Sequence, residues 1–272
     1  MRYVSFRRPD GASRYGRLEG EQVVELGDSL RQAITQGWLG EDADGPHHAL
    51  DGLDLLPPIP DPGKIICIGL NYATHLSEMG NKRPDHPTVF TRFTNTLVAN
   101  GAPLVKPSNS DRFDYEGELA VVIGRPARHV GREQAMNHVA GFSVFNDASV
   151  RDWQRHTSQF TPGKNFPSSG GFGPALVTPD EIGDLTAIRV QTRLNGELMQ
   201  DQPISDMLWP VAELIEYLSS FTELAPGDVI VTGTPGGVGD ARTPPVYMQA
   251  GDVVEVSIGA IGTLQNQVIA ES

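Results

Sequence analysis

Hydrophobic and polar positions alternate over the first part of the chain, which is the pattern of short antiparallel strands. This alternation predicts three strands, over residues 2–6, 13–18 and 22–26. Turn-forming residues separate them at Pro9-Asp10-Gly11 and at Glu19-Gly20-Glu21. A short helix is expected over residues 28–38, with Asp28 as its N-cap.

Residues 41–63 interrupt this pattern. The segment is acidic and rich in proline, which is typical of a linker. We therefore predict a boundary near residue 60, between a small N-terminal α+β module (residues 1–60) and a larger domain (residues 61–272). His47 and His48 lie in the polar linker, and we interpret them as solvated side chains rather than metal ligands.

Beyond residue 63, short apolar runs bounded by glycine predict a mixed fold that is mostly β with a few helices. Strands are expected over residues 64–69, 118–124, 139–145, 188–194, 197–200, 228–231 and 253–258. Helices are expected over residues 72–79, 132–137 and 209–220. The last is the best defined, because Val211, Leu214, Ile215 and Leu218 share one face.

Composition narrows the class of protein. Hydrophobic residues make up 39% of the 272 positions, which is enough for a sizeable core. A formal net charge of −13, without any run of lysine or arginine, argues against a nucleic-acid binder. No apolar run approaches the length of a membrane span, and the N-terminus lacks the apolar stretch of a signal peptide. We expect a cytoplasmic protein without a membrane partner.

Two carboxylates stand at the start of a predicted strand. Glu116 and Glu118 are two positions apart and therefore point to the same face. They lead into an apolar run that looks buried, and charges placed there need a partner. A divalent cation would remove the repulsion between them. Metal binding and a solvated strand edge are both open at this point.

A third carboxylate, Asp147, follows another apolar strand. An aspartate in this position is often a helix N-cap, and Asp152 offers a second candidate for that task. Three carboxylates without histidine or cysteine would form a hard oxygen site, which selects Mg²⁺, Mn²⁺ or Ca²⁺ over zinc.

His75 and Glu78 are three residues apart on a predicted helical turn, so that their side chains are neighbours. A carboxylate beside an imidazole fixes its tautomer and prepares it as a general base. Lys164 is presented by the turn Thr161-Pro162-Gly163. The glycine-rich segment 231–239 lacks the phosphate-loop pattern, but its backbone amides can line a carboxylate site.

Taken in order, these segments resemble the fumarylacetoacetate hydrolase family over residues 61–272. The motifs are Gly-Leu-Asn-Tyr-x-x-His-x-x-Glu-Met-Gly, Asp-Tyr-Glu-Gly-Glu-Leu, the Asp147 segment ending in Arg-Asp, Gly-Lys-Asn-Phe, and Thr-Gly-Thr-Pro-x-Gly-Val-Gly. The first 60 residues resemble the small variable module that many members carry. The resemblance implies a β-roll catalytic domain, bound Mg²⁺ or Mn²⁺ (sometimes Ca²⁺), and a homodimer.

The resemblance also implies roles for individual residues. The family's metal ligands match Glu116, Glu118 and Asp147, its base dyad matches His75 and Glu78, and its conserved lysine matches Lys164. As substrate-binding residues we predict Tyr72, Arg92, Arg151, Gln159 and Thr234. Many relatives have Phe-x-Lys-Pro where this chain has Phe-Thr-Arg-Phe, so that Arg92 replaces a lysine. The loops around residues 81–96 and 153–172 are expected to set the substrate, and Arg155 is either a substrate contact or a surface residue.

We expect a hydrolase that cleaves a carbon–carbon bond in a small β-diketo acid of the acylpyruvate or fumarylpyruvate type. His75 would deprotonate the attacking water, while metal and Lys164 stabilise the enolate that leaves. An oxaloacetate-type decarboxylase, or an isomerase or hydratase of aromatic degradation, is the alternative. The sequence lacks the Gly-x-Ser-x-Gly motif of a serine hydrolase. We interpret Cys67, which lies in an apolar run, as a core residue rather than a nucleophile. A non-enzymatic metal-binding protein would have no need for His75 and Lys164.

Overall fold

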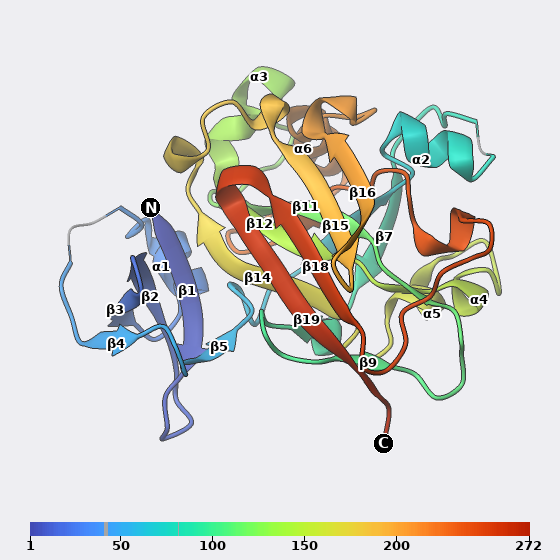
Figure 1. Ribbon diagram of the computed structural model, residues 1–272. Helices are drawn as coiled ribbons and strands as arrows, with labels where there is room; N and C mark the ends of the chain where they lie inside the picture. The colour runs from blue at the N-terminus through green and yellow to red at the C-terminus, as the bar shows by residue number, and fades with distance from the viewer. Residues whose placement is uncertain (41–42, 81) are drawn as a thin grey trace.

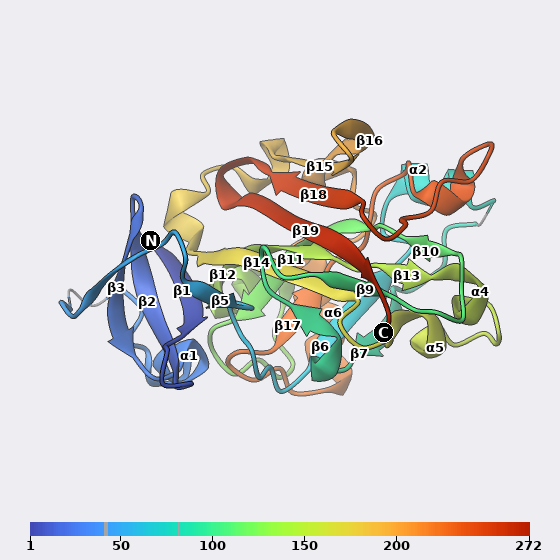
Figure 2. The same cartoon turned by 60° about the horizontal axis from the view of Figure 1, so that its bottom comes forward.

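The computed structural model describes residues 1–40, 43–80 and 82–272 (Figure 1). The fold is mostly β, with mixed sheets and few helices, as the sequence predicts. A 12-stranded sheet runs through both parts of the chain, in the order β4-β3-β2-β1-β14-β12-β11-β17-β6-β7, with β5 on β1 and β8 on β14. A five-stranded sheet, β16-β15-β18-β19-β9, lies over it (Figure 2).

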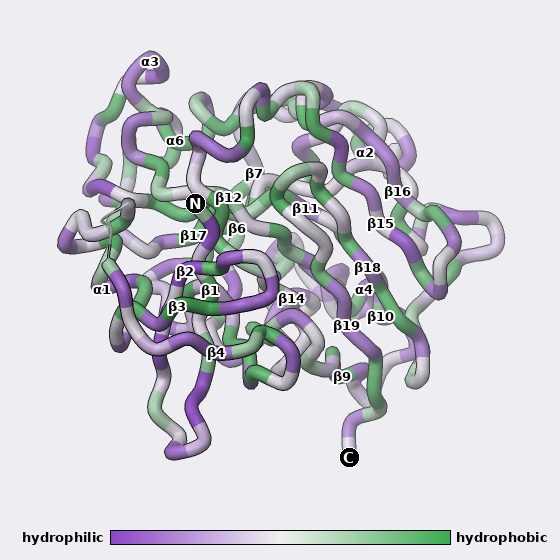
Figure 3. The backbone as a smooth tube through the Cα atoms, turned by 60° about the vertical axis from the view of Figure 1, so that its left-hand side comes forward, coloured by the Kyte–Doolittle hydropathy of each residue, from purple (hydrophilic) through white to green (hydrophobic). Residues whose placement is uncertain are grey.

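The N-terminal module contains β1 (Arg2–Arg7), β2 (Ser13–Glu19), β3 (Gln22–Gly27), α1 (Leu30–Gln36), β4 (His47–Ala49) and β5 (Asp54–Leu56). The three predicted strands are confirmed. The predicted N-cap of the helix is wrong, because the side chain of Ser29, not Asp28, accepts the hydrogen bond from the Gln32 backbone amide. In Figure 3 the tip of the β1–β2 hairpin is hydrophilic.

The predicted linker is also wrong over its described part, residues 43–63; residues 41 and 42 lie outside the described residues. The two three-residue strands β4 and β5 pair with β3 and β1. Each strand is only three residues long, too short for an alternating pattern to stand out in the sequence. The two histidines lie on β4, where His48 contacts Glu25 at 2.9 Å and His47 contacts Gln22 at 3.2 Å.

The larger part contributes the inner strands of the long sheet, namely β6 (Ile65–Gly69), β7 (Thr88–Arg92), β8 (Leu97–Val98), β11 (Gly117–Ile123), β12 (Val139–Asn146), β14 (Gly170–Val177) and β17 (Val229–Val231). The five-stranded sheet contains β9 (Leu104–Lys106), β15 (Arg189–Leu194), β16 (Glu197–Pro203), β18 (Val253–Ile258) and β19 (Gly262–Ala270). A two-stranded sheet pairs β10 (Phe113–Asp114) with β13 (Ser149–Val150).

The helices of this part are α2 (Ala73–Glu78), α3 (Arg132–Ala135), α4 (Arg151–Gln154), α5 (Thr161–Lys164) and α6 (Val211–Phe221). Single 3₁₀ turns cover Thr94–Thr96, Met136–His138, Pro179–Glu181, Leu185–Ala187, Ile204–Asp206, Gly239–Ala241 and Gly259–Ile261. The described helices are too short and too polar in composition for any of them to cross a bilayer.

Strand β11 lies at the centre of the core and is buried along its whole length. One face carries Leu119 and Val121, which pack with α6 and the five-stranded sheet. The other face carries Ala120 and Val122, which pack with residues of α1 and β1 from the N-terminal module. Because side chains alternate along a strand, Glu118 points to the same face as Ala120 and Val122. It lies near the start of the strand, beside this part of the core.

Candidate active site

Antiparallel pairing of β11 with β12 brings the three predicted metal ligands together. Gly117 pairs with Asn146 in the register of the two strands. Glu116, which precedes Gly117, therefore lies beside Asp147, which follows Asn146. The Asp147 amide donates a hydrogen bond of 2.8 Å to the backbone carbonyl of Glu116. Glu116, Glu118 and Asp147 are all buried, and one carboxylate oxygen of each lies within 4.8 Å of the others.

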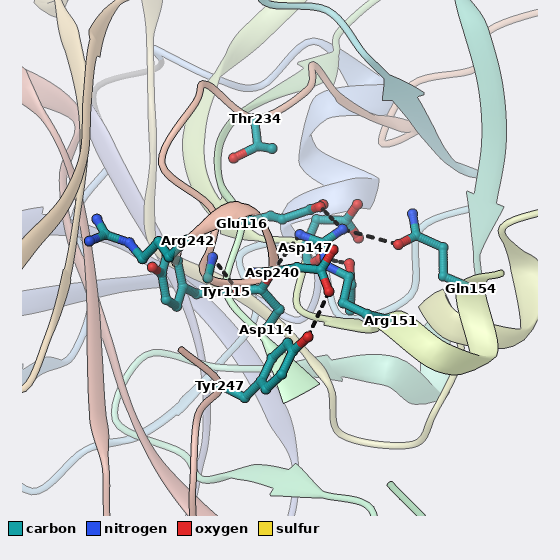
Figure 4. Close-up of polar contacts among 12 residues, drawn as sticks. Asp114, Tyr115, Glu116, Asp147, Arg151, Gln154, Thr234, Asp240, Arg242 and Tyr247 are labelled. Carbon is teal, nitrogen blue, oxygen red and sulfur yellow. Dashed lines mark hydrogen bonds and ion pairs between the residues drawn. The ribbon is translucent and has the colours of Figure 1, made fainter. Parts of the chain in front are cut away.

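Buried cations balance this charge, and two of them contact Glu116. Lys164, at the end of α5, places its ammonium group against Glu116 and Asp147, at 2.5 Å from Asp147 Oδ2. Arg151, the first residue of α4, contacts Glu116 Oε1 at 2.6 Å and Asp114 Oδ2 at 2.8 Å (Figure 4). Both cations are almost fully buried. The buried carboxylates are therefore paired with buried cations, as charges in a protein interior require.

The carboxylates differ in their electrostatic surroundings. Burial alone would raise the pKa of Glu116, but the Arg151 guanidinium and the Lys164 ammonium lower it to about 2. Burial, together with the charges of Asp147 and Glu116, raises the pKa of Glu118 well above its usual range. Glu118 accepts a hydrogen bond of 2.5 Å from the Gly233 amide. A cation bound by all three would favour the ionised form of Glu118.

The donor set fits a divalent metal ion. Three converging carboxylates form a hard oxygen site of the kind that binds Mg²⁺, Mn²⁺ or Ca²⁺. Asp147 is not a helix N-cap, because α4 begins after Val150 and shows no side-chain cap. Asp152 does not cap it either, and instead accepts a hydrogen bond of 2.7 Å from Ser110. Of the readings open from sequence, a metal site fits this geometry best.

His75 and Glu78 form the expected pair on α2. Nδ1 of His75 lies 2.8 Å from Glu78 Oε1, and Glu78 Oε2 accepts a hydrogen bond of 2.8 Å from the Gly237 amide. Glu78 is therefore fixed by the glycine-rich loop and in turn fixes the imidazole ring. Because Nδ1 faces Glu78, the Nε2 nitrogen is left for chemistry on the other side of the ring.

The carboxylate triad (Glu116, Glu118 and Asp147) and His75 line one cavity of about 230 Å³. Its lining includes most of the predicted site residues, namely His75, Glu116, Glu118, Asp147, Arg151, Lys164 and Thr234. The remaining wall is formed by Ile68, Gly69, Leu70, Met79, Phe90, Gln154, Arg155 and Phe160. Thr234 is held by a hydrogen bond of 2.8 Å from Gln200 and donates one of 3.0 Å to the Gly117 carbonyl.

Arg92 lies behind the triad instead of lining the cavity. Its guanidinium donates to Asp147, to the Ala148 carbonyl at 3.1 Å and to Ser169 at 2.5 Å. The prediction that Arg92 reads a substrate carboxylate is therefore not supported by this geometry. A buried arginine supporting Asp147 explains why a positive charge is kept at this position.

Tyr72 and Gln159 are not among the cavity-lining residues either. Tyr72 is fully buried in the core, and burial raises the pKa of its hydroxyl. Gln159 is exposed, and its backbone amide donates to Thr157 at 3.1 Å. Cys67 is buried in the core as predicted, and burial raises the pKa of its thiol.

Sequence reasoning gave no role to Asp114 and Gln154, which complete the surroundings of Arg151. Asp114 accepts from Arg151 and from the backbone amides of Gly239 and Asp240, at 2.8 and 3.0 Å for the amides. Gln154 accepts from Arg151 at 3.0 Å and lines the cavity. Their spacing offered a signal, because Asp114 stands two positions before Glu116 and Gln154 lies one helical turn beyond Arg151.

The loop predicted to offer backbone amides to a carboxylate does so for carboxylates of the protein itself, Glu118 and Glu78. The segments expected to be loops around the cavity contain regular structure as well. Strand β7 lies within residues 81–96, of which residue 81 is outside the described residues, and α5 lies within residues 153–172.

Comparisons with known proteins agree with this geometry. The model of the fumarylacetoacetate (FAA) hydrolase C-terminal family matches residues 64–269, and a model described as Rv2993c-like, N-terminal, matches residues 1–58. The mitochondrial oxaloacetate tautomerase fahd2 of Xenopus laevis is 39% identical over 252 residues, which cover 91% of this chain and 77% of that protein.

Several solved structures match the whole chain, and two of them illustrate the range of activities. A fumarylacetoacetate hydrolase from Exiguobacterium antarcticum superposes with a TM-score of 0.90 at 38% identity, and the match covers 100% of both chains. A 5-carboxymethyl-2-hydroxymuconate delta-isomerase from Mycobacterium smegmatis superposes with a TM-score of 0.85 at 31% identity, again over 100% of both chains.

Proposed function

The chain belongs to the fumarylacetoacetate hydrolase family, and from this premise we propose that it is a metal-dependent tautomerase of a small 2-oxo acid such as oxaloacetate. The observation that carries the proposal is the shared cavity. An oriented histidine and a buried lysine line it together with three carboxylates. Tautomerisation needs a group that moves a proton to or from carbon, which is the histidine here. It also needs positive charge beside the carbonyl oxygen, which the lysine supplies.

His75 is the proton carrier in this proposal. Its Nε2 takes a proton from C3 of the keto acid, and the C–H electron pair forms the C2–C3 double bond. The carbonyl electron pair moves onto the C2 oxygen, which then takes a proton from a water molecule. The hydroxide that remains is neutralised by the proton that His75 releases. In the opposite direction the protonated histidine returns its proton to C3. Glu78 keeps the ring in the orientation that both directions need.

Lys164 supplies positive charge beside the C2 oxygen, and a metal ion held by the three carboxylates would add to it. Burial opposes the charge of Lys164, but the neighbouring Asp147 and Glu116 raise its pKa, so the ammonium form is kept. Glu116, Glu118 and Asp147 would hold a Mg²⁺ or Mn²⁺ ion, which when bound supplies Lewis-acid stabilisation of the enolate charge.

This proposal changes the expectation drawn from sequence, in which hydrolysis came first and an oxaloacetate-type decarboxylase, or an isomerase or hydratase, was the alternative. The tautomerase and isomerase relatives fit the alternative better. The His75–Glu78 pair serves either reaction, because a base that accepts a proton from carbon can also accept one from water. The match to a fumarylacetoacetate hydrolase keeps cleavage as the competing reaction.

The test follows three reactions of one preparation. Metal-stripped protein is mixed with the enol form of oxaloacetate, with and without added Mg²⁺ or Mn²⁺, and decay of the enol absorbance is recorded. Cleavage of an acylpyruvate and release of CO₂ are measured in parallel. We expect metal-dependent acceleration of enol decay. Metal-dependent cleavage or CO₂ release without faster enol decay would instead identify a hydrolase or a decarboxylase.

A further inference from the structure

The cavity has three cationic lining residues among those the structure describes, Arg151, Arg155 and Lys164, and they are not equivalent. Lys164 forms ion pairs with Glu116 and Asp147. Arg151 forms ion pairs with Glu116 and Asp114. The Arg155 side chain is 47% exposed and pairs with a carboxylate away from the triad.

Arg155 follows directly after helix α4, as its C-cap residue. Arg151 and Arg155 are four residues apart, which corresponds to one helical turn and to about 6 Å along the helix axis. Both side chains line the cavity. Arg151 reaches Glu116 at 2.6 Å, so Arg155 lies one turn farther along the same wall.

The guanidinium of Arg155 is held from behind by Asp240. Nη1 lies 3.3 Å from Asp240 Oδ1, and Nη2 contacts Asp240 Oδ2. Asp240 itself is fixed by the Tyr247 hydroxyl, which donates a hydrogen bond of 2.7 Å (Figure 4). A guanidinium has five N–H donors, so that Arg155 keeps donors for a second anion while it stays paired with Asp240.

Apart from His75 and the three cations, the described lining residues away from the carboxylates carry no ionisable side chain, although Gln154 and Thr234 are polar. They include the apolar side chains of Leu70, Met79, Phe90 and Phe160. A carboxylate placed against these alone would lose its hydration without gaining a partner. A substrate with a second carboxylate therefore needs the Arg155 end of the cavity.

We propose that Arg155 binds the distal carboxylate of the substrate, and that the site thereby selects 2-oxo diacids over 2-oxo monoacids. This inference rests on the proposed function. The 2-oxo acid end of the substrate lies at the triad, and the second carboxylate lies one helical turn away. Asp240 and Tyr247 are positioning residues that orient the arginine.

The kinetic test compares oxaloacetate with 2-oxobutanoate, in which a methyl group replaces the distal carboxylate. Proton exchange at C3 is followed by NMR in D₂O for both compounds. Loss of a charge-assisted hydrogen bond in Arg155→Gln should raise KM for oxaloacetate about 10- to 100-fold, with little change in kcat. Kinetics with 2-oxobutanoate should stay unchanged, and Arg155→Lys should recover part of the loss.

Arg189→Gln is the matched control. Arg189 is 48% exposed and pairs with Asp201 at 2.6 Å, so this variant also removes a half-exposed, paired arginine, but one outside the residues that line the cavity. It should leave both substrates unaffected. If Arg155→Gln weakens turnover of the diacid and the monoacid equally, Arg155 supports the fold of the wall and the inference is wrong.

A binding measurement separates this inference from the proposed function. Mn²⁺-loaded protein is titrated calorimetrically with malate and with 2-hydroxybutanoate, which differ in the same carboxylate. The wild type should bind malate more tightly, and Arg155→Gln should remove that preference. This result would support the inference even if the wild type failed to tautomerise oxaloacetate. Equal affinities for the two ligands in the wild type would overturn it.

Discussion

Lys164 helps several carboxylates to share a buried site. It contacts two members of the triad, while Arg151 also contacts Glu116 and Arg92 also contacts Asp147. Removing one partner of a buried ion pair is costly, because the remaining buried charges lose part of their compensation. The same lysine is in place to stabilise an enolate, so that one side chain supports both the fold and the proposed reaction.

Lys164→Met should therefore destabilise the metal-free protein by about 3–5 kcal/mol. Added Mn²⁺ should restore much of this loss, because the ion supplies the missing positive charge. Denaturant unfolding with and without Mn²⁺ measures both effects. Lys106→Met is the control, since Lys106 pairs with the exposed Asp111 and should cost less than about 1 kcal/mol. Equal stability of Lys164→Met and wild type without metal would contradict this account.

Glu118 makes metal binding depend on pH. Its pKa is raised by burial first and then by Asp147 and Glu116, so that metal-free Glu118 keeps its proton to higher pH than an ordinary glutamate. A metal ion needs the ionised form and must displace that proton. Affinity for Mn²⁺ should consequently increase as pH rises through the pKa of metal-free Glu118.

Calorimetry of Mn²⁺ binding in buffers of different ionisation enthalpy measures the number of protons that are released when the ion binds. At a pH below the pKa of metal-free Glu118, we expect the wild type to release a proton when it binds Mn²⁺. Glu118→Gln should bind the ion more weakly and without that release. Binding by the wild type that releases no proton and shows the same affinity at every pH would show that Glu118 is already ionised.

At the scale of elements, the site depends on how closely β11 packs against the five-stranded sheet. A Cβ added at Gly117 would lie 2.2 Å from Thr192 Oγ1 and 2.9 Å from Val256 Cγ1. Gly117 separates the two glutamates of the triad, so any displacement of β11 would move both. The glycine is required here by packing rather than by its backbone conformation.

Gly117→Ala should therefore weaken Mn²⁺ affinity at least about tenfold, which corresponds to 1.4 kcal/mol. The double variant Gly117→Ala/Thr192→Ala should recover part of it, because it removes the nearest clashing atom. Thr192 Oγ1 is buried without a hydrogen-bond partner among the described residues, so Thr192→Ala alone should be nearly neutral. Gly131→Ala, which meets nothing within 4 Å, is the control. Unchanged affinity in Gly117→Ala would contradict this view.

The elements around the triad were also those most open to sequence reasoning. Strands β11 and β12 are mostly apolar, and the carboxylates stand at or next to their ends, so strand type and candidate ligands follow from local pattern. Strand β14 was missed because its sequence contains glycine and proline, which are depleted from strands. The direction of the Arg92 side chain was missed because it depends on Asp147, which is distant in sequence.

At the scale of the whole molecule, the N-terminal module and the larger part share one sheet and one core. Strand β1 pairs with β14, with Arg2 opposite Val177 and Tyr3 opposite Leu176. Leu30 on α1 belongs to the same buried cluster as Phe145 on β12. The module therefore supports the strand that ends at Asp147, although the three ligands and the base dyad all belong to the larger part.

We also propose that two copies of the chain associate, as the family resemblance implies. Light scattering on a size-exclusion column should give twice the 29.4 kDa mass of one chain, and dilution into the nanomolar range should not change it. The mass of a single chain at micromolar concentration would contradict this expectation.

The central claim is that His75 moves a proton at the carbon next to a carbonyl, within reach of the carboxylate triad. The most direct test is deuterium incorporation at C3 of 2-oxobutanoate in D₂O, catalysed by Mg²⁺-loaded wild type and by His75→Asn. We predict metal-dependent exchange that falls about 10²- to 10⁴-fold in the variant, while its Mn²⁺ affinity is retained. Exchange at the wild-type rate in a variant that still binds Mn²⁺ would contradict the claim.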